Sequence, residues 1–301
     1  MLIKYRAFHI QHIQKNLEMM NIKLCRVLKD ITGVTGMKII RAIIAGERDT
    51  VKLARFRDPR CFSSEEDIAK SLEGNYKPEH MFALSQAVLL FDDYTGYVKS
   101  CDREIERNYS AFKCCNDDPL PKKRAKSSKK NRPSFNLRKH LYQVCGVDLT
   151  MIDGIDALTA QVVLSEIGTD MTKWETVKHF TSWLSVCPCN KVSGGRILRA
   201  GSKKSKNRAS LALRVAARSL HGSKSAMGAF YRRMRAKHGP MKANLAAAHR
   251  MARTIYFMLL NKTEFKDPGD EYYQQKYQNR VIRNLKRKAA ETGFELKPVE
   301  A

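Results

Sequence analysis

The chain has 301 residues, of which 56 are Lys or Arg and 30 are Asp or Glu, so its formal net charge is +26. A charge this large repels itself in a compact fold, and the phosphates of nucleic acids are the commonest partner that compensates it. No stretch reaches the roughly 20 apolar residues that span a bilayer, and the start of the chain lacks the apolar segment of a signal peptide. The sequence therefore predicts a protein that binds nucleic acid, does not enter the membrane and stays where it is made. On charge alone, a ribosomal or chromatin-like structural role is an alternative.

Apolar residues near the start of the chain recur at alternating intervals of three and four, the spacing of a coiled coil. The first stripe, expected on one long helix, comprises Ile10, Ile13, Leu17, Met20, Leu24, Val27 and Ile31. A second, less regular stripe comprises Met81, Leu84, Val88, Phe91, Thr95, Val98, Asp102 and Ile105. These helices pair either with each other, antiparallel, or with a second copy of the chain; an ordinary helix packed on its own domain has the same spacing. We predict a helical coiled-coil region over residues 1–112 and a homo-oligomer formed through it.

Residues 113–135 are predicted to be a basic linker, because they lack apolar periodicity and contain a dense run of Lys and Arg from Lys122 to Arg132. Such a tether adds affinity for phosphates that does not depend on sequence. Helical patterns resume in residues 136–262 and again in a basic tail over residues 263–301. Strand-like alternation is not evident, so the predicted fold class is mainly α.

Residues 149–168 have the pattern of a helix-hairpin-helix, in which Gly154 makes the turn and residues 159–167 form the second helix. Backbone N–H groups at the start of such a helix bind a DNA phosphate. However, Asp156 stands where a second glycine is usual and Asp153 flanks the turn, and both acids would repel phosphate. The alternative is a hairpin that only packs and orients the domain that follows.

Ser193 is followed at once by Gly194 and Gly195. The basic residues close behind it are Arg196, Arg199, Lys203, Lys204, Lys206 and Arg208. The segment lacks the pattern of a P-loop. It is either a flexible contact to the DNA backbone or a loop whose serine attacks phosphorus, with the glycines allowing close approach and the cations stabilising the developing charge.

The order of four motifs resembles the insertion-sequence one-ten family of transposases, and within it the eleven-eleven branch. The motifs are Asp148-Leu-Thr-Met-Ile-Asp-Gly-Ile155, Ser193-Gly-Gly195, Lys206-Asn-Arg-Ala209 and Ala226-Met-Gly-Ala-Phe-Tyr-Arg-Arg-Met234. Segments near both ends, such as Asp30-Ile-Thr-Gly-Val-Thr-Gly36 and Arg283-Asn-Leu-Lys-Arg-Lys-Ala-Ala290, extend the resemblance over essentially the whole chain.

The resemblance implies three parts: a RuvC-like nuclease domain with four acidic residues that bind divalent metal, a coiled coil, and a C-terminal domain whose serine matches Ser193. Together they make an RNA-guided recombinase in which the serine bonds covalently to DNA, so DNA and a guide RNA are implied partners. In this chain Met1 is expected to fall just past the nuclease domain. No acidic quartet elsewhere is expected to replace that domain, because Glu65, Glu66 and Asp67 are adjacent surface-like charges. We therefore expect a transposase fragment, inactive alone, in a bacterial cytoplasm near the nucleoid. No cofactor is expected in this chain, and Mg²⁺ only with the missing domain.

Two other interpretations differ in class. Tyr256, with His249, Arg250 and Arg253, has the residue types of a tyrosine recombinase, but these residues share two turns of one predicted helix, which favours packing. In the second interpretation, the chain is a remnant that only binds nucleic acid, or an inhibitor of full-length transposase. Zinc binding at Cys187 and Cys189 is disfavoured because no further ligands follow at zinc spacing.

Overall fold

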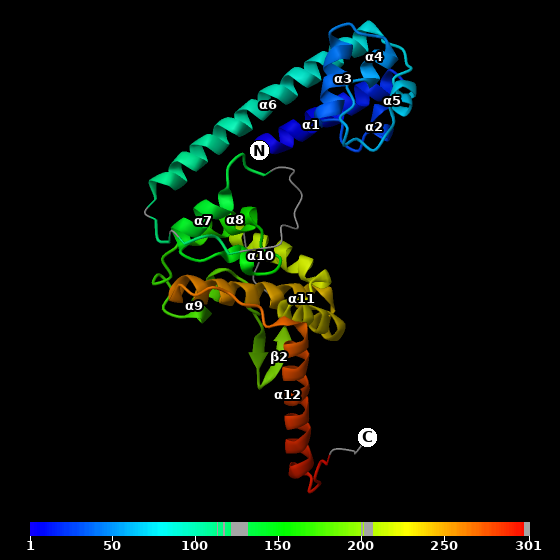
Figure 1. Ribbon diagram of the computed structural model, residues 1–301. Helices are drawn as coiled ribbons and strands as arrows, with labels where there is room; N and C mark the ends of the chain where they lie inside the picture. Colours follow the sequence, from blue (N-terminus) through cyan, green and yellow to red (C-terminus); the bar gives the residue numbers. More distant parts are fainter. Residues whose placement is uncertain (113, 117, 122–131, 200, 202–206, 298–301) are drawn as a thin grey trace. The chain divides into compact units, whose positions relative to one another are not determined.

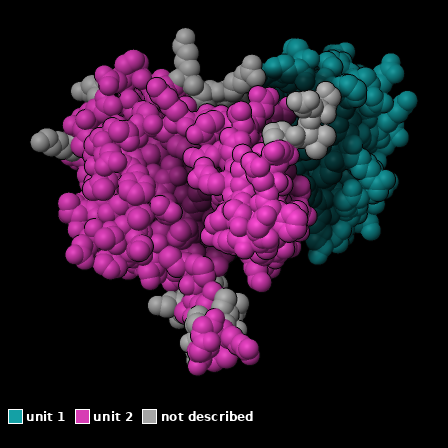
Figure 2. Space-filling model, turned by 90° about the horizontal axis from the view of Figure 1, so that it is seen from below, with its two compact units in different colours: residues 1–105 teal, residues 106–301 magenta. Residues whose placement is uncertain are grey.

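The computed structural model describes residues 1–112, 114–116, 118–121, 132–199, 201 and 207–297 (Figure 1). The chain divides into two compact units, Met1–Ile105 and Glu106–Ala301, which Figure 2 shows in separate colours. Helices dominate both units, so the prediction of a mainly α protein is confirmed. None of the helices in the described parts is long and apolar enough to cross a membrane. The basic run Lys122–Arg132 of the predicted linker lies almost wholly outside the described residues.

Unit 1 is a bundle of helices around an aliphatic core. Its elements are α1 (Leu2–Met19), α2 (Leu24–Val27), α3 (Val34–Ile44), α4 (Thr50–Ala54), α5 (Glu65–Ser71) and most of α6 (Pro78–Ala111). Side chains cap two of the shorter helices: the Asp49 carboxylate accepts N–H groups at the start of α4, and the Ser64 hydroxyl does so for α5. Such caps satisfy backbone donors that have no partner within the helix.

The prediction of one long first helix is wrong, because α1 ends at Met19. Asn21 has a positive φ of 60°, which ends the helical path, and Leu24 begins the separate helix α2. Ile13, Leu17, Met20 and Leu24 are nevertheless all fully buried in the core of unit 1. The heptad-like spacing therefore reflects packing within the unit, across a break in the helix.

The two predicted stripes meet within one chain. Tyr5 and His9 of α1 contact the Tyr94 ring of α6, at centroid distances of 5.6 and 5.3 Å. Further along α1, Leu17 shares the core with Leu84, which lies earlier on α6. Residue numbers rise along one helix as they fall along the other, so the pair is antiparallel. The homo-oligomer through a coiled coil stays a prediction.

Unit 2 contains the remaining elements. They are α7 (Leu137–Cys145), the 3₁₀ helix η1 (Leu149–Met151), α8 (Ala157–Ile167), α9 (Val177–Trp183), β1 (Lys191–Ser193), β2 (Arg196–Arg199), α10 (Arg208–Ser219), η2 (Leu220–Gly222), α11 (Ala226–Asn261) and α12 (Gly269–Glu291). Five of these α-helices begin with an N-cap residue whose side chain accepts a backbone N–H of the first turn: Asn136, Asp156, Thr176, Asn207 and Ser225.

The core of unit 2 lies where α8, α10 and α11 pack together. Small buried side chains on α10 and α11, including Ala217, Ala248 and Ala252, allow these helices to approach closely. The helix α11 is kinked at Gly239, whose φ of 79° and ψ of 169° are not helical, just before Pro240. Proline lacks an N–H and crowds the preceding turn, so a kink at this place is expected.

The hairpin formed by β1 and β2 was not predicted from the sequence. The segment was expected to be a flexible glycine loop in a fold without strands. Instead the strands pair antiparallel, with Ser193 opposite Arg196 and Val192 opposite Ile197. The physical reason is the two-residue Gly-Gly connection, one of the turns that close a hairpin directly.

Candidate functional site

The serine hairpin, residues 191–199, ends in a glycine turn open to solvent. Gly194 and Gly195 have φ values of 55° and 73°. Positive φ at both central residues defines a type I′ turn, whose twist matches that of the flanking strands. Apart from its chain neighbours, a Cβ atom added at either glycine would meet no atom of the described residues within 4 Å. The turn is therefore shaped by backbone requirements alone and leaves room for a ligand.

Ser193 and Arg196 flank this turn and pair directly across the two strands. Directly opposed residues of an antiparallel pair project from the same face, with Cβ atoms about 5 Å apart. Both residues are exposed. A hydroxyl and a guanidinium thus stand on one face at the tip of the hairpin, a suitable arrangement for contacting a phosphate group.

Hydrogen bonds hold the base of the serine hairpin. The Cys189 N–H donates to the Gly201 carbonyl at 2.7 Å. Arg214 of α10 donates to the Ser185 carbonyl at 2.8 Å, where Ser185 has a positive φ of 55°. Cys187 donates its thiol hydrogen to the Thr181 hydroxyl, with a sulfur–oxygen distance of 3.1 Å. The bonds of Ser185 and Cys187 tie the segment before the hairpin to α10 and α9, and give Cys187 a structural role.

The structure describes only some of the other basic residues predicted to contact DNA. Arg199 ends β2, and its side chain lies outside the described part of the structure. Lys203, Lys204 and Lys206 also fall outside it. Arg208, at the start of α10, forms an ion pair with Glu166 of α8. Of the basic residues predicted to contact DNA, Arg196 is the one that the structure describes beside Ser193.

The second predicted glycine turn, at Gly154, is closed. Gly154 has a φ of 88°, and a Cβ atom added there would lie 2.8 Å from the Ala216 carbonyl oxygen, 2.9 Å from the Ser219 hydroxyl and 3.0 Å from the Met251 methyl carbon. The predicted first helix of this motif is the short 3₁₀ helix η1. Close packing against α10 and α11 gives an independent reason for glycine here, so the phosphate-binding role of Gly154 stays a prediction.

Asp156 occupies the position where a second glycine is usual, and its side chain has a structural role there. Its carboxylate accepts the Thr159 N–H at 2.8 Å and so caps α8. The negative charge lies at the positive end of the helix dipole, which stabilises the helix. Asp156, which we expected to repel phosphate, thus has a structural function at the position where a phosphate was expected to bind.

Two further acids hold the segment before Gly154. Asp148 is buried and ion-paired with Arg138 of α7, and it also accepts the Thr150 N–H at 3.0 Å. Asp153 accepts a hydrogen bond from the Ser223 hydroxyl, just before α11. Sequence reasoning missed both partners, because Arg138 and Ser223 have no fixed spacing from these acids. Only the capping pattern of an Asp two residues before Thr150 is readable from the chain.

Tyr256 is excluded as an exposed nucleophile. Its side chain is 4% exposed, its ring packs on Phe180, and its hydroxyl donates to the Trp174 carbonyl at 3.1 Å. The tyrosine recombinase interpretation is therefore wrong: Tyr256 is part of the core of unit 2.

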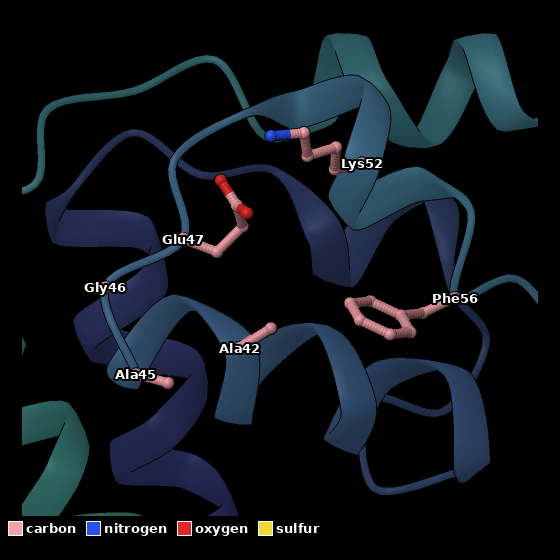
Figure 3. A pocket seen from close by; sticks show the side chains of 6 residues that line it. All are labelled: Ala42, Ala45, Gly46, Glu47, Lys52 and Phe56. Atoms are coloured by element: carbon pink, nitrogen blue, oxygen red, sulfur yellow. The ribbon is translucent and has the colours of Figure 1, made fainter.

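A hollow of about 500 Å³ opens in unit 1 (Figure 3). It is lined by Ala42, Ala45, Gly46, Glu47, Lys52 and Phe56. The Glu47 carboxylate accepts the N–H groups of Asp49 and Arg48, which lowers the pKa of Glu47. The Glu47 carboxylate therefore stabilises the local turn. The described residues hold no group of three His, Cys, Asp or Glu side chains that could bind a metal ion.

The serine hairpin lies within a region that is similar to a family of transposases. Residues 147–232 match the model of the Transposase IS116/IS110/IS902 family. The match covers less than a third of the chain and includes the Gly154 turn, the serine hairpin and α10. Over these residues the chain is similar to a family of transposases. No curated protein and no solved structure matches the chain.

Proposed function

We propose that this chain binds DNA as part of an insertion-sequence transposase and that Ser193 is the nucleophile of strand transfer. The observation that carries the proposal is the pairing of Ser193 with Arg196 at the open glycine turn, inside the region that matches the transposase family. The branch suggested by the eleven-eleven resemblance, a separate acidic nuclease domain and a guide RNA belong to the same proposal.

The chemistry follows from the groups at the hairpin tip. The Ser193 hydroxyl gives its proton to a carboxylate of the separate domain as its oxygen attacks a phosphodiester phosphorus. A new P–O ester bond forms, the P–O bond to one deoxyribose breaks, and the displaced oxygen takes up a proton from solvent and leaves as a hydroxyl. The Arg196 guanidinium stabilises the negative charge that develops on the phosphate oxygens. The open turn lets the DNA backbone come close to both groups. Activation of the serine hydroxyl is assigned to carboxylates of the separate domain.

The test is strand transfer on labelled element-end DNA with Mg²⁺, using the chain alone and with a supplied acidic nuclease domain plus candidate guide RNA. We expect a covalent protein–DNA product on a denaturing gel with the supplied domain, and its loss in Ser193→Ala. Two matched controls remove other hydroxyls of unit 2: Ser165→Ala, whose exposed hydroxyl donates to the Val162 carbonyl within its own helix, and Tyr256→Phe in the core. Both are expected to keep the product.

One alternative is separated by the same experiment. If no covalent product forms under any condition while salt-sensitive binding of DNA persists, the chain is a nucleic-acid-binding remnant or an inhibitor of full-length transposase. If Ser165→Ala or Tyr256→Phe abolishes the product as fully as Ser193→Ala does, Ser193 is not the specific nucleophile.

A further inference from the structure

The helix α12 carries a row of cations along one face. Lys276, Arg280, Arg283 and Arg287 are spaced at intervals of four, three and four residues, so they line one side of the helix over about 16 Å. No residue of α12 is buried, and all four side chains are exposed. We call these four residues the α12 basic ridge. Lys286 and Lys288 belong to the same turns but project away from it.

The charge of the ridge is largely uncompensated within the chain. Among the described residues, no carboxylate lies within 4 Å of the charged groups of Lys276, Arg280 or Arg283, and Arg287 has only an exposed pair with Glu291 at 3.8 Å. Elsewhere arginines are neutralised: Arg41 by Asp92 and Arg138 by Asp148. The ridge therefore concentrates positive charge on a surface that needs an anionic partner.

Aromatic stacking fixes the start of α12 on the kinked helix α11. The guanidinium carbon of Arg233 lies 4.0 Å from the centre of the Tyr277 ring and 5.2 Å from that of Tyr273. Arg250, on the other arm of α11, lies 5.6 Å from the Tyr273 ring. Arg232 adds an ion pair with Asp270 at 2.6 Å. The first turns of α12 are thus anchored, and the ridge continues from them along the same continuous helix (Figure 1).

We infer that the α12 basic ridge binds the phosphate backbone of duplex DNA. The inference rests on the proposed function, because it supplies that function with a second DNA contact, separate from the serine hairpin. An α-helix of about 10–12 Å diameter fits the major groove of B-DNA, about 12 Å wide, where one face meets the phosphates of the groove edge. The deep, narrow major groove of RNA duplexes does not admit a helix. The arginines of the ridge bind phosphate with two N–H groups each.

The experiment measures affinity of the full chain for a random-sequence DNA duplex by fluorescence anisotropy, from about 50 to 200 mM salt. The test variant is Arg283→Gln with Arg287→Gln; the matched control is Lys286→Gln with Lys288→Gln. Each removes two positive charges from the same exposed turns, and equal circular dichroism spectra would show that the fold is kept. We expect the ridge variant to bind about tenfold more weakly and to reduce the slope of log affinity against log salt by about two, with a much smaller change in the control.

Several results overturn the inference. Equal losses in the two variants would show that only total charge matters. A loss for a structured RNA without a loss for duplex DNA would assign the ridge to RNA, and a changed sedimentation mass with unchanged DNA affinity would assign it to a second copy of the chain. If the unaltered chain binds no duplex, both the ridge and the proposed function fail; if it binds and the ridge variant is unaffected, only the ridge fails.

Discussion

The two glycine turns of unit 2 have similar backbones and opposite surroundings. Gly154, Gly194 and Gly195 all have positive φ, and both turns were predicted to approach DNA. At Gly154 the space for a side chain is filled by Ala216, Ser219 and Met251. At Gly194 and Gly195 an added Cβ atom would meet, apart from its chain neighbours, no described atom within 4 Å. Glycine is required at the first turn by neighbouring atoms as well as by φ, and at the second by φ alone.

The difference shows that a glycine-containing motif does not by itself identify a ligand site. A closed turn uses the missing side chain to bring helices together, and an open turn leaves that space to a partner. In unit 2 the closed turn supports the core and the open turn carries Ser193. Substitutions at the two turns should therefore separate stability from activity.

The largest expected effect is that of Gly154→Ala. The new methyl group would lie 2.8 Å from the Ala216 carbonyl oxygen and the residue would keep a φ of 88°, so overpacking and backbone strain add. We expect a loss of about 4 kcal/mol in the free energy of unfolding of unit 2. Urea unfolding followed by tryptophan fluorescence measures it, because both tryptophans, Trp174 and Trp183, lie in unit 2. A cost no larger than that of Gly195→Ala would contradict the closed turn.

Next in size is Arg138→Met, which removes the ionic partner of Asp148 from the segment before the closed turn. Asp148 is 2% exposed and Arg138 24%, so the variant leaves a nearly buried carboxylate without its cation. We expect a loss of about 3 kcal/mol by the same fluorescence assay. Arg208→Met is the control, because the side chain of Arg208 is 74% exposed in its pair with Glu166 and its loss should cost less than about 1 kcal/mol. Similar costs for the two variants would refute the role of the buried pair.

Gly195→Ala at the open turn should change stability little. Only the positive φ of 73° opposes the methyl group, so about 1 kcal/mol is expected. The same variant should reduce formation of the covalent DNA product more than it reduces stability, because the methyl group occupies space left for DNA. Parallel unfolding and strand-transfer assays test this, and a variant that loses stability but keeps full activity would show that the turn does not face DNA.

The smallest effect concerns His249, two residues from Met251 on α11. Burial, followed by the charge of Arg253, lowers the pKa of His249 below 6.5. The folded protein therefore prefers the neutral ring, and stability is lost as pH falls from about 6.5 toward the lowered pKa. His249→Gln should reduce the drop in melting temperature of unit 2 between neutral and mildly acidic pH. An unchanged drop would mean that other groups cause the acid sensitivity.

Sequence patterns predicted the parts of the fold that depend on local chemistry. The helical patterns expected over residues 136–262 include α10, whose N-cap is Asn207, and the helix expected over 159–167 lies within α8. Periodicity did not reveal where α1 ends, because Met20 and Leu24 continue the apolar spacing beyond the break near Asn21. The hairpin was missed because its strands are only three and four residues long, too short to show alternation.

The sequence alone determined a strongly basic, mainly helical chain and the place of Ser193 beside two glycines, since charge, helix periodicity and turn residues are local properties. Only the tertiary structure decided which glycine turn is open, that Tyr256 is buried, and that Ser193 faces the same side as Arg196. These features depend on contacts between residues far apart in the chain or on strand register. Their spacing in the sequence follows no rule, because packing of whole elements brings them together.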